Sequence, residues 1–125
     1  MAGRIAVAEG RPTISTHVLD LELGTPAAGV AVDLSRIGAD GSVLDLALGR
    51  TTDRDGRVAD LLGDVDLAAG IYEIRFDVAA HDIDKKRRPR FFWTVALHFE
   101  VTDTSRSYHV PLLLSPYGLA TYRGS

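Results

Sequence analysis

The sequence contains no cysteine among its 125 residues, and it carries a single methionine and a single tryptophan. The absence of cysteine excludes disulfides and thiolate metal sites, and it is compatible with a reducing compartment. No stretch approaches the ~20 consecutive apolar residues that a membrane-spanning helix needs, and residues 1–10 lack the apolar run of a secretion signal. The sequence therefore predicts a cytoplasmic protein with no membrane partner.

The chain also lacks a strong excess of charge of one sign, because its formal net charge is only −3. Such a balance gives no general attraction to nucleic acid or to an anionic membrane. The basic run from Lys85 to Arg90 is the one exception, and a short run of this kind in an acidic chain is more often a solvated loop. We therefore expect no nucleic-acid partner.

The length of the chain fits one domain with one core. Residues 1–12 show no periodicity and end in Gly10-Arg11-Pro12, which is typical of a flexible leader. The sequence thus predicts a leader over 1–12 and a single domain over 13–125.

Alternation of apolar and polar residues recurs along the domain and is typical of half-buried strands. It predicts strands over 14–21, 30–35, 43–49, 71–78, 93–101 and 107–114. Arg57 begins a further strand after the turn at Asp53–Gly56, and a last short strand follows the turn at Ser115–Gly118. The polar connection over 79–90 leaves room for one short helix before Pro89. Seven to eight short strands with little helix predict an all-β, two-sheet antiparallel sandwich.

The strand over 107–114 has two distinct faces, since successive side chains point to opposite sides of a strand. One face carries Tyr108, Val110, Leu112 and Leu114. His109, Pro111 and Leu113 must then lie on the other face. Proline cannot donate to a strand ladder, so Pro111 is expected on an edge strand or at a bulge. Leu113 beside it suggests that this outer face contacts another subunit.

Three separated motifs in this sequence resemble those of the 5-hydroxyisourate hydrolases, the transthyretin-related enzymes of urate breakdown. They are Ser-Thr-His-Val-Leu-Asp at 15–20, Thr-Thr-Asp-Arg-Asp-Gly-Arg at 51–57, and His-Val-Pro-Leu-Leu-Leu-Ser-Pro-Tyr at 109–117 followed by Tyr-Arg-Gly-Ser at 122–125. Because they stand in the right order over nearly the whole chain, the resemblance is specific. It implies the transthyretin fold, a homotetramer with sites at the subunit interface, and hydrolysis of 5-hydroxyisourate to 2-oxo-4-hydroxy-4-carboxy-5-ureidoimidazoline without a cofactor.

The resemblance also implies which residues act. His17 and His109 match the histidines of two motifs, and Arg57 matches the arginine that directly follows the Asp-Gly pair. Opening a cyclic amide requires a base for water, a donor for the oxyanion and an acid for the departing nitrogen. Two histidines and one arginine supply these groups, and which histidine is the base stays open. Apart from the motifs, a single histidine such as His81 or His98 is more often a solvated side chain.

The end of the chain carries the remaining candidates. Ser125 can orient the attacking water, while Tyr122 and Arg123 can hold a planar, carbonyl-rich ring by stacking and hydrogen bonding. Terminal residues usually fray unless something ties them down. A function for these three residues therefore predicts a docked tail.

Other functions fit the sequence less well. A transthyretin-like carrier of a small ligand is the main alternative, but the resemblance implies that such carriers lack the two histidines, the arginine and the terminal Tyr-Arg-Gly-Ser. A metal site at His17, His109 and Asp20 lacks any local pair of ligands at metal-binding spacing. Ser125 lacks the strained Gly-x-Ser-x-Gly turn of a serine nucleophile. We therefore expect neither a metal nor a covalent serine intermediate.

Overall fold

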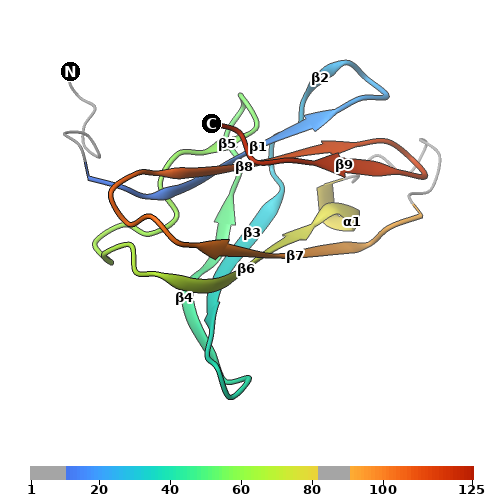
Figure 1. Cartoon of the computed structure of the whole chain (residues 1–125). Coiled ribbons are helices and arrows are strands. Elements are labelled where there is room, and N and C mark those ends of the chain that lie inside the picture. Colours follow the sequence, from blue (N-terminus) through green and yellow to red (C-terminus); the bar gives the residue numbers. More distant parts are fainter. Residues whose placement is uncertain (1–10, 82–90) are drawn as a thin grey trace.

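The structure, a computed structural model, describes residues 11–81 and 91–125. Residues 1–10 of the predicted leader over 1–12 and the basic run Lys85–Arg90 lie outside these ranges. The described residues form a two-sheet β-sandwich with one four-residue helix (Figure 1). The elements in chain order are β1 (Ile14–Asp20), β2 (Thr25–Pro26), β3 (Ala31–Ile37), β4 (Val43–Thr51), β5 (Arg57–Val58), β6 (Gly70–Asp77), α1 (Val78–His81), β7 (Thr94–Val101), β8 (Tyr108–Leu114) and β9 (Leu119–Thr121).

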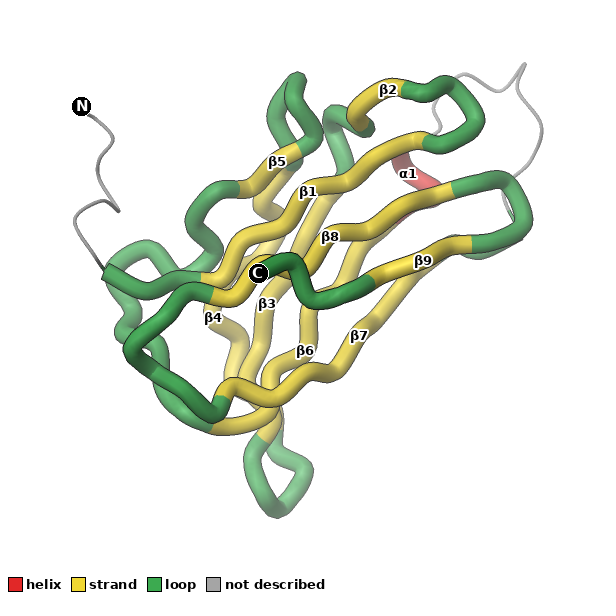
Figure 2. The backbone as a smooth tube through the Cα atoms, turned by 45° about the horizontal axis from the view of Figure 1, so that its top comes forward, coloured by secondary structure: helices red, strands yellow, loops and turns green. Residues whose placement is uncertain are grey.

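The first sheet has the strand order β2-β1-β8-β9, with β5 also paired to β1. The second sheet has the order β4-β3-β6-β7 and is antiparallel throughout. Figure 2 shows the two sheets stacked, with β7 and β9 along the same side of the sandwich. One pair departs from the predicted antiparallel arrangement, because β1 and β8 run parallel over seven residues each. Two strands so far apart in sequence are not joined by a hairpin, so no turn dictates their relative direction.

The core lies between the sheets and is built from the alternate residues of each strand. In β1 the buried positions are Ile14, Thr16, Val18 and Asp20, and in β6 they are Tyr72, Ile74 and Phe76. Burying one such apolar side chain stabilises the fold by roughly 1.5–3 kcal/mol. The intermediate residues, Ser15 and His17 in β1, are thereby left on the outer face of the first sheet.

Most of the predicted strands are confirmed to within two residues at each end. The sequence did not predict β2, where Thr25 and Pro26 pair with Asp20 and Leu19. The short helix lies over Val78–His81, at the start of the segment where one was expected. No helix among the described residues is long and apolar enough to cross a membrane.

The prediction that Pro111 lies on an edge strand or at a bulge is wrong, since β8 is an internal strand, between β1 and β9, and its register with β1 is unbroken at Pro111. Pro111 is also buried within the single chain. The sheet tolerates it because regular pairing of β8 with β9 begins only at Leu112, and the next contact along the tail is an isolated bridge between His109 and Gly124. Pro111 falls in the gap between the two, where its carbonyl accepts a hydrogen bond from the Thr121 hydroxyl at 2.7 Å. The missing N–H of Pro111 therefore coincides with the break in pairing between β8 and the end of the chain.

Candidate active site on the outer face of the first sheet

Strand register brings His17 and Arg57 together. His17 in β1 lies opposite Arg57 in β5 on one side and opposite Pro111 in β8 on the other. Directly opposed residues project from the same face of a sheet, with Cβ atoms ~4.5–5.5 Å apart in an antiparallel pair. His17 is partly buried and Arg57 is exposed, so both side chains lie on the outer face, away from the core.

A tight turn over Asp53–Arg57 sets the position of Arg57. The Asp53 carboxylate accepts the backbone N–H of Asp55 at 2.9 Å and of Arg57 at 3.0 Å. Gly56 follows with a φ of +78°, and its carbonyl accepts the N–H of Val18 at 2.7 Å. A Cβ at Gly56 would clash with the Val18 carbonyl, so only glycine lets this turn lie close enough to β1 to pair Arg57 with His17.

The Asp53 carboxylate also faces the cations of this site. Its pKa lies below the usual value, chiefly because of the hydrogen bond from the Arg57 backbone and further because of the charges of Arg57 and His17. The Asp53 carboxylate therefore stays ionised at neutral pH beside both side chains.

His109 in β8 lies two pairs further along the same ladder, opposite Ser15 of β1. The Ser15 hydroxyl and the His109 Nδ1 are hydrogen-bonded at 2.8 Å. Burial, and then the positive charges of Arg57 and His17, lower the pKa of His109. This ring is therefore neutral at neutral pH, and it lies within electrostatic reach of both other candidates.

The C-terminal tail, residues 122–125, is docked against β8, as a function for Tyr122, Arg123 and Ser125 requires. The N–H of Gly124 donates to the His109 carbonyl at 2.8 Å, and the two residues form an antiparallel bridge. A Cβ at Gly124 would lie 2.7 Å from His109 Cδ2 and 3.3 Å from Pro111 Cγ. The tail backbone thus packs directly against the His109 ring, and Ser125 follows it as an exposed residue.

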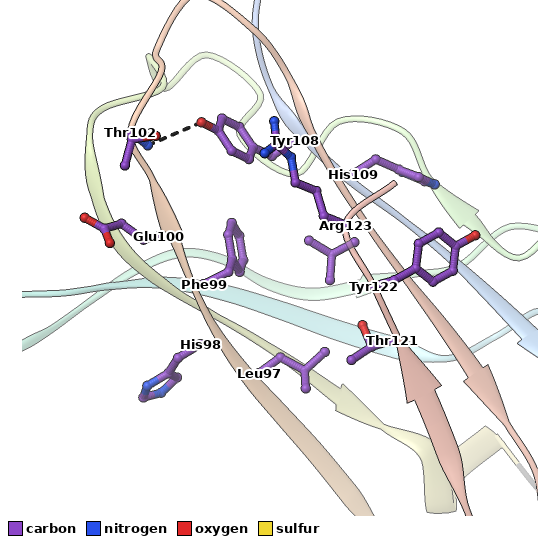
Figure 3. A pocket seen from close by; sticks show the side chains of 11 residues that line it. Leu97, His98, Phe99, Glu100, Thr102, Tyr108, His109, Thr121, Tyr122 and Arg123 are labelled. Atoms are coloured by element: carbon purple, nitrogen blue, oxygen red, sulfur yellow. Dashed lines mark hydrogen bonds between the residues drawn. The ribbon is translucent and has the colours of Figure 1, made fainter. Parts of the chain in front are cut away.

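The three tail candidates do not gather at one point. The Arg123 guanidinium carbon lies 5.3 Å from the centre of the Tyr108 ring, a cation–π contact. In Figure 3 the Arg123 side chain extends toward Tyr108, whereas Tyr122 extends to the same side as His109. The contact with Tyr108 holds Arg123 away from the outer face that carries His17 and Arg57.

A groove of about 250 Å³ opens between the two sheets along β7 and the tail. Apolar side chains of Leu97, Phe99 and Val110 line it together with Tyr108, Tyr122 and Arg123 (Figure 3). His17 and Arg57 are not among its lining residues. The groove therefore lies at the open side of the sandwich, apart from His17 and Arg57, and His109 is the one member of this trio that lines it.

The structure separates the site candidates from other residues of the same kinds. His98 lies on the second sheet, where its Nε2 is hydrogen-bonded to Glu73 at 3.0 Å rather than to the neighbouring Glu100. Arg54 is exposed in the turn, and the Arg50 guanidinium donates to the Asp60 carbonyl at 3.0 Å. The side chain of His81 lies outside the described part of the structure.

Sequence reasoning missed Ser15 and Gly124, both of which contact the His109 ring. Ser15 shares a face with His17 by simple alternation, which was a usable signal. Its pairing with His109 depends on a register between strands 94 residues apart, and no local pattern encodes that register. Within the described ranges, no three His, Asp or Glu side chains gather in a way that could hold a metal ion.

Comparison with known proteins agrees with this architecture. The model of the HIUase/Transthyretin family matches residues 14–124. The chain therefore belongs to the HIUase/Transthyretin family, which spans the hydrolases and the transthyretins.

Individual relatives include both kinds of protein. A 5-hydroxyisourate hydrolase of Deinococcus radiodurans is 42% identical over 119 residues, covering 93% of this chain and 98% of that protein. The structure of Klebsiella pneumoniae 5-hydroxyisourate hydrolase is similar with a TM-score of 0.76 and 36% identity, over 91% of this chain and 99% of that one. Sea bream transthyretin in complex with thyroxine is similar with a TM-score of 0.79 and 30% identity, over 89% and 93% of the two chains.

Proposed function

We propose that this protein hydrolyses 5-hydroxyisourate to 2-oxo-4-hydroxy-4-carboxy-5-ureidoimidazoline, in the degradation of urate. The observation that carries the proposal is the gathering of His17, Arg57 and His109 on one outer face, in a chain about 40% identical to curated hydrolases of this substrate. The location in the cytoplasm stays a prediction from the sequence.

The proposed reaction opens the substrate ring at its C6 carbonyl. A histidine takes a proton from water as the water oxygen bonds to C6, and the Arg57 guanidinium stabilises the oxyanion that forms. The bond from C6 to the ring nitrogen then breaks, the nitrogen takes a proton from an imidazolium, and a carboxylate remains. His109 suits this chemistry because its lowered pKa keeps it neutral, and so able to accept a proton, at neutral pH. The steps require side chains and water alone.

Tail residues have a proposed role in holding the substrate. Ser125 orients the attacking water, and Tyr122, which is 59% exposed, has a face available for a planar ring. Arg123 would have to leave the Tyr108 ring to reach a substrate on the outer face. Its role in substrate binding therefore requires a rotation of its side chain.

Replacing Arg57 by lysine should weaken catalysis markedly, because lysine keeps the charge but loses the planar, forked arrangement of donors. We expect kcat/KM to fall by about tenfold or more, the usual scale for one lost oxyanion donor being ~10²-fold or higher. Arg54→Lys is the matched control, since Arg54 lies three residues away in the same turn and is exposed. Equal losses for the two variants would contradict the assignment of Arg57.

The transthyretin carriers define a second candidate function, favoured by the similarity to sea bream transthyretin in complex with thyroxine. A carrier would bind a small aromatic ligand and release it unchanged. The two functions are separated by generating 5-hydroxyisourate from urate and following its ultraviolet decay with and without the protein. Faster decay supports the hydrolase, and an unchanged rate of decay contradicts it.

We further propose that the protein is a homotetramer with its sites at subunit interfaces. Within the described ranges nothing pairs with the outer side of β7 or β9, and both edges lie on the same side of the sandwich. Phe91 and Trp93 before β7 and Tyr117 before β9 are all more than 60% exposed. An unpaired strand edge presents backbone N–H and C=O groups with which another chain can pair, and exposed aromatic side chains beside it would add apolar contact area to such an interface. Arg57 is also exposed in the single chain, so a neighbouring subunit would help to exclude water from the site.

Light scattering without any ligand should therefore give about four times the 13.5 kDa mass of one chain. The proposal rests on the open edges and exposed aromatic residues rather than on Pro111, which is already covered within the chain. A 13.5 kDa species at micromolar concentration would contradict both the tetramer and a site shared between subunits.

A further inference from the structure

The His109 ring is held from two sides by residues to which the mechanism gives no role. On one side Ser15 engages Nδ1 at 2.8 Å. On the other side the Gly124 backbone lies against Cδ2, so closely that a Cβ at this position would be 2.7 Å away. Rotation of the ring about its χ angles would break the first contact or close the second. The edge of the ring that remains available carries Nε2.

We propose that Ser15 is a positioning residue that accepts a hydrogen bond from His109 Nδ1–H and so leaves Nε2 as an unprotonated acceptor facing the site. This inference rests on the proposed hydrolase function in one respect, because that function identifies the attacking water as the molecule from which Nε2 takes a proton.

The choice of tautomer follows from the surrounding groups. A serine hydroxyl can donate or accept, so Ser15 alone does not decide which ring nitrogen carries the proton. The choice therefore depends on the charged and titratable groups around His109. Arg57 from β5 and His17 from β1 both disfavour added positive charge on the ring, and the tail contributes Arg123 and Tyr122 to the same neighbourhood. The charge of Arg57 acts on the His109 ring, and a guanidinium has only donors, so an unprotonated Nε2 on the open edge of the ring is favoured over an Nε2–H.

The two histidines would then have different roles in catalysis. With Nδ1–H bonded to Ser15, His109 takes a proton from water at Nε2, and the resulting imidazolium keeps its Nδ1 bond to the serine oxygen. Ser15 thus stabilises the charge that forms on the ring, in addition to fixing the orientation of the ring. His17 is left as the group that can donate to the departing nitrogen.

The direct test is the ¹⁵N spectrum of the histidine rings in the substrate-free protein at neutral pH, with the His109 signals assigned by their loss in His109→Gln. We expect His109 Nδ1 in the protonated range and Nε2 in the unprotonated range. In Ser15→Ala the two tautomers should become mixed. An Nε2-protonated ring in the wild-type protein, or identical spectra for the wild type and Ser15→Ala, would overturn the proposal.

Kinetics give the second readout. We expect Ser15→Ala to lower kcat by about tenfold with little change in KM, the scale of one hydrogen bond of about 1.4 kcal/mol. Ser15→Thr, which keeps the hydroxyl and suits a strand, should restore most of the rate. Ser35→Ala is the matched control, since Ser35 is a strand serine on the second sheet whose hydroxyl donates to Asp45 at 3.0 Å.

Failure of this inference is distinct from failure of the proposed function. If the wild-type protein did not accelerate the decay of 5-hydroxyisourate, the tautomer of His109 would still be measured without substrate. An active enzyme whose kcat is unchanged in Ser15→Ala would overturn the role of Ser15 and leave the hydrolase function intact.

Discussion

His109→Ala is expected to lower the rate of 5-hydroxyisourate hydrolysis by ~10²-fold or more, the usual scale for loss of a positioned acid or base. His17→Ala should have an effect of the same size, because one ring must accept a proton and the other must donate one. Both variants should fold, since the two side chains lie on the outer face of the first sheet rather than in the core. Steady-state kinetics and thermal unfolding of the same samples measure the two effects separately.

His98→Ala is the control for both substitutions. His98 is also on a strand and also hydrogen-bonded, but its partner is Glu73 on the second sheet. We expect its activity to match that of the wild type. A folded His98→Ala protein that lost as much activity as His109→Ala would show that the wrong histidines were chosen.

The second large effect is expected from Gly124→Ala. The added Cβ would lie 2.7 Å from His109 Cδ2, a separation that real Cβ atoms essentially never show. Either the His109 ring must shift or the tail must leave β8, and both movements disturb the site. Misplacement of a reacting group by about 1 Å can cost 10²-fold in rate, so we expect a loss of about this size. The melting temperature should change little, because the tail lies outside the core.

A matched glycine in the same part of the chain provides the comparison. A Cβ at Gly118 would meet only the Ser115 hydroxyl oxygen, at 3.3 Å, and that side chain can rotate away. Gly118→Ala should therefore keep most of the activity. Full activity of Gly124→Ala would mean that the tail is not part of the site and that catalysis depends on His17, Arg57 and His109 alone.

Much of the sandwich could be predicted from local patterns. Alternation placed the strands β1, β6, β7 and β8, because residues two apart on a strand share an environment, but it left open which face of β1 is buried. The turn Asp53–Gly56 placed Arg57 at a strand start, since its Asp and Gly residues have direct conformational reasons to be there. These predictions needed only residues close together in sequence.

Features that depend on residues far apart could not be predicted in this way. The parallel pairing of β1 with β8 determines that His109 lies opposite Ser15 and that Pro111 lies inside a sheet. The contact of Arg123 with Tyr108 depends on how the tail folds back along β8. The family motifs identified most of the candidate residues, but only the assembled sheet relates them to one another.

The parallel pairing of β1 and β8 also bears on when activity can appear during folding. The hydrogen bonds that join Ser15 to His109 and Thr16 to Val110 each span 94 residues, and closing so long a loop is entropically unfavourable until other contacts have formed. Proteins dominated by such distant pairings fold slowly, typically in milliseconds to seconds. The second sheet, whose neighbouring strands are all antiparallel, can form before the two ends of the domain meet. Recovery of activity on refolding would then lag behind recovery of β-structure, because a chain whose β1 and β8 have not yet paired has no His109 beside His17.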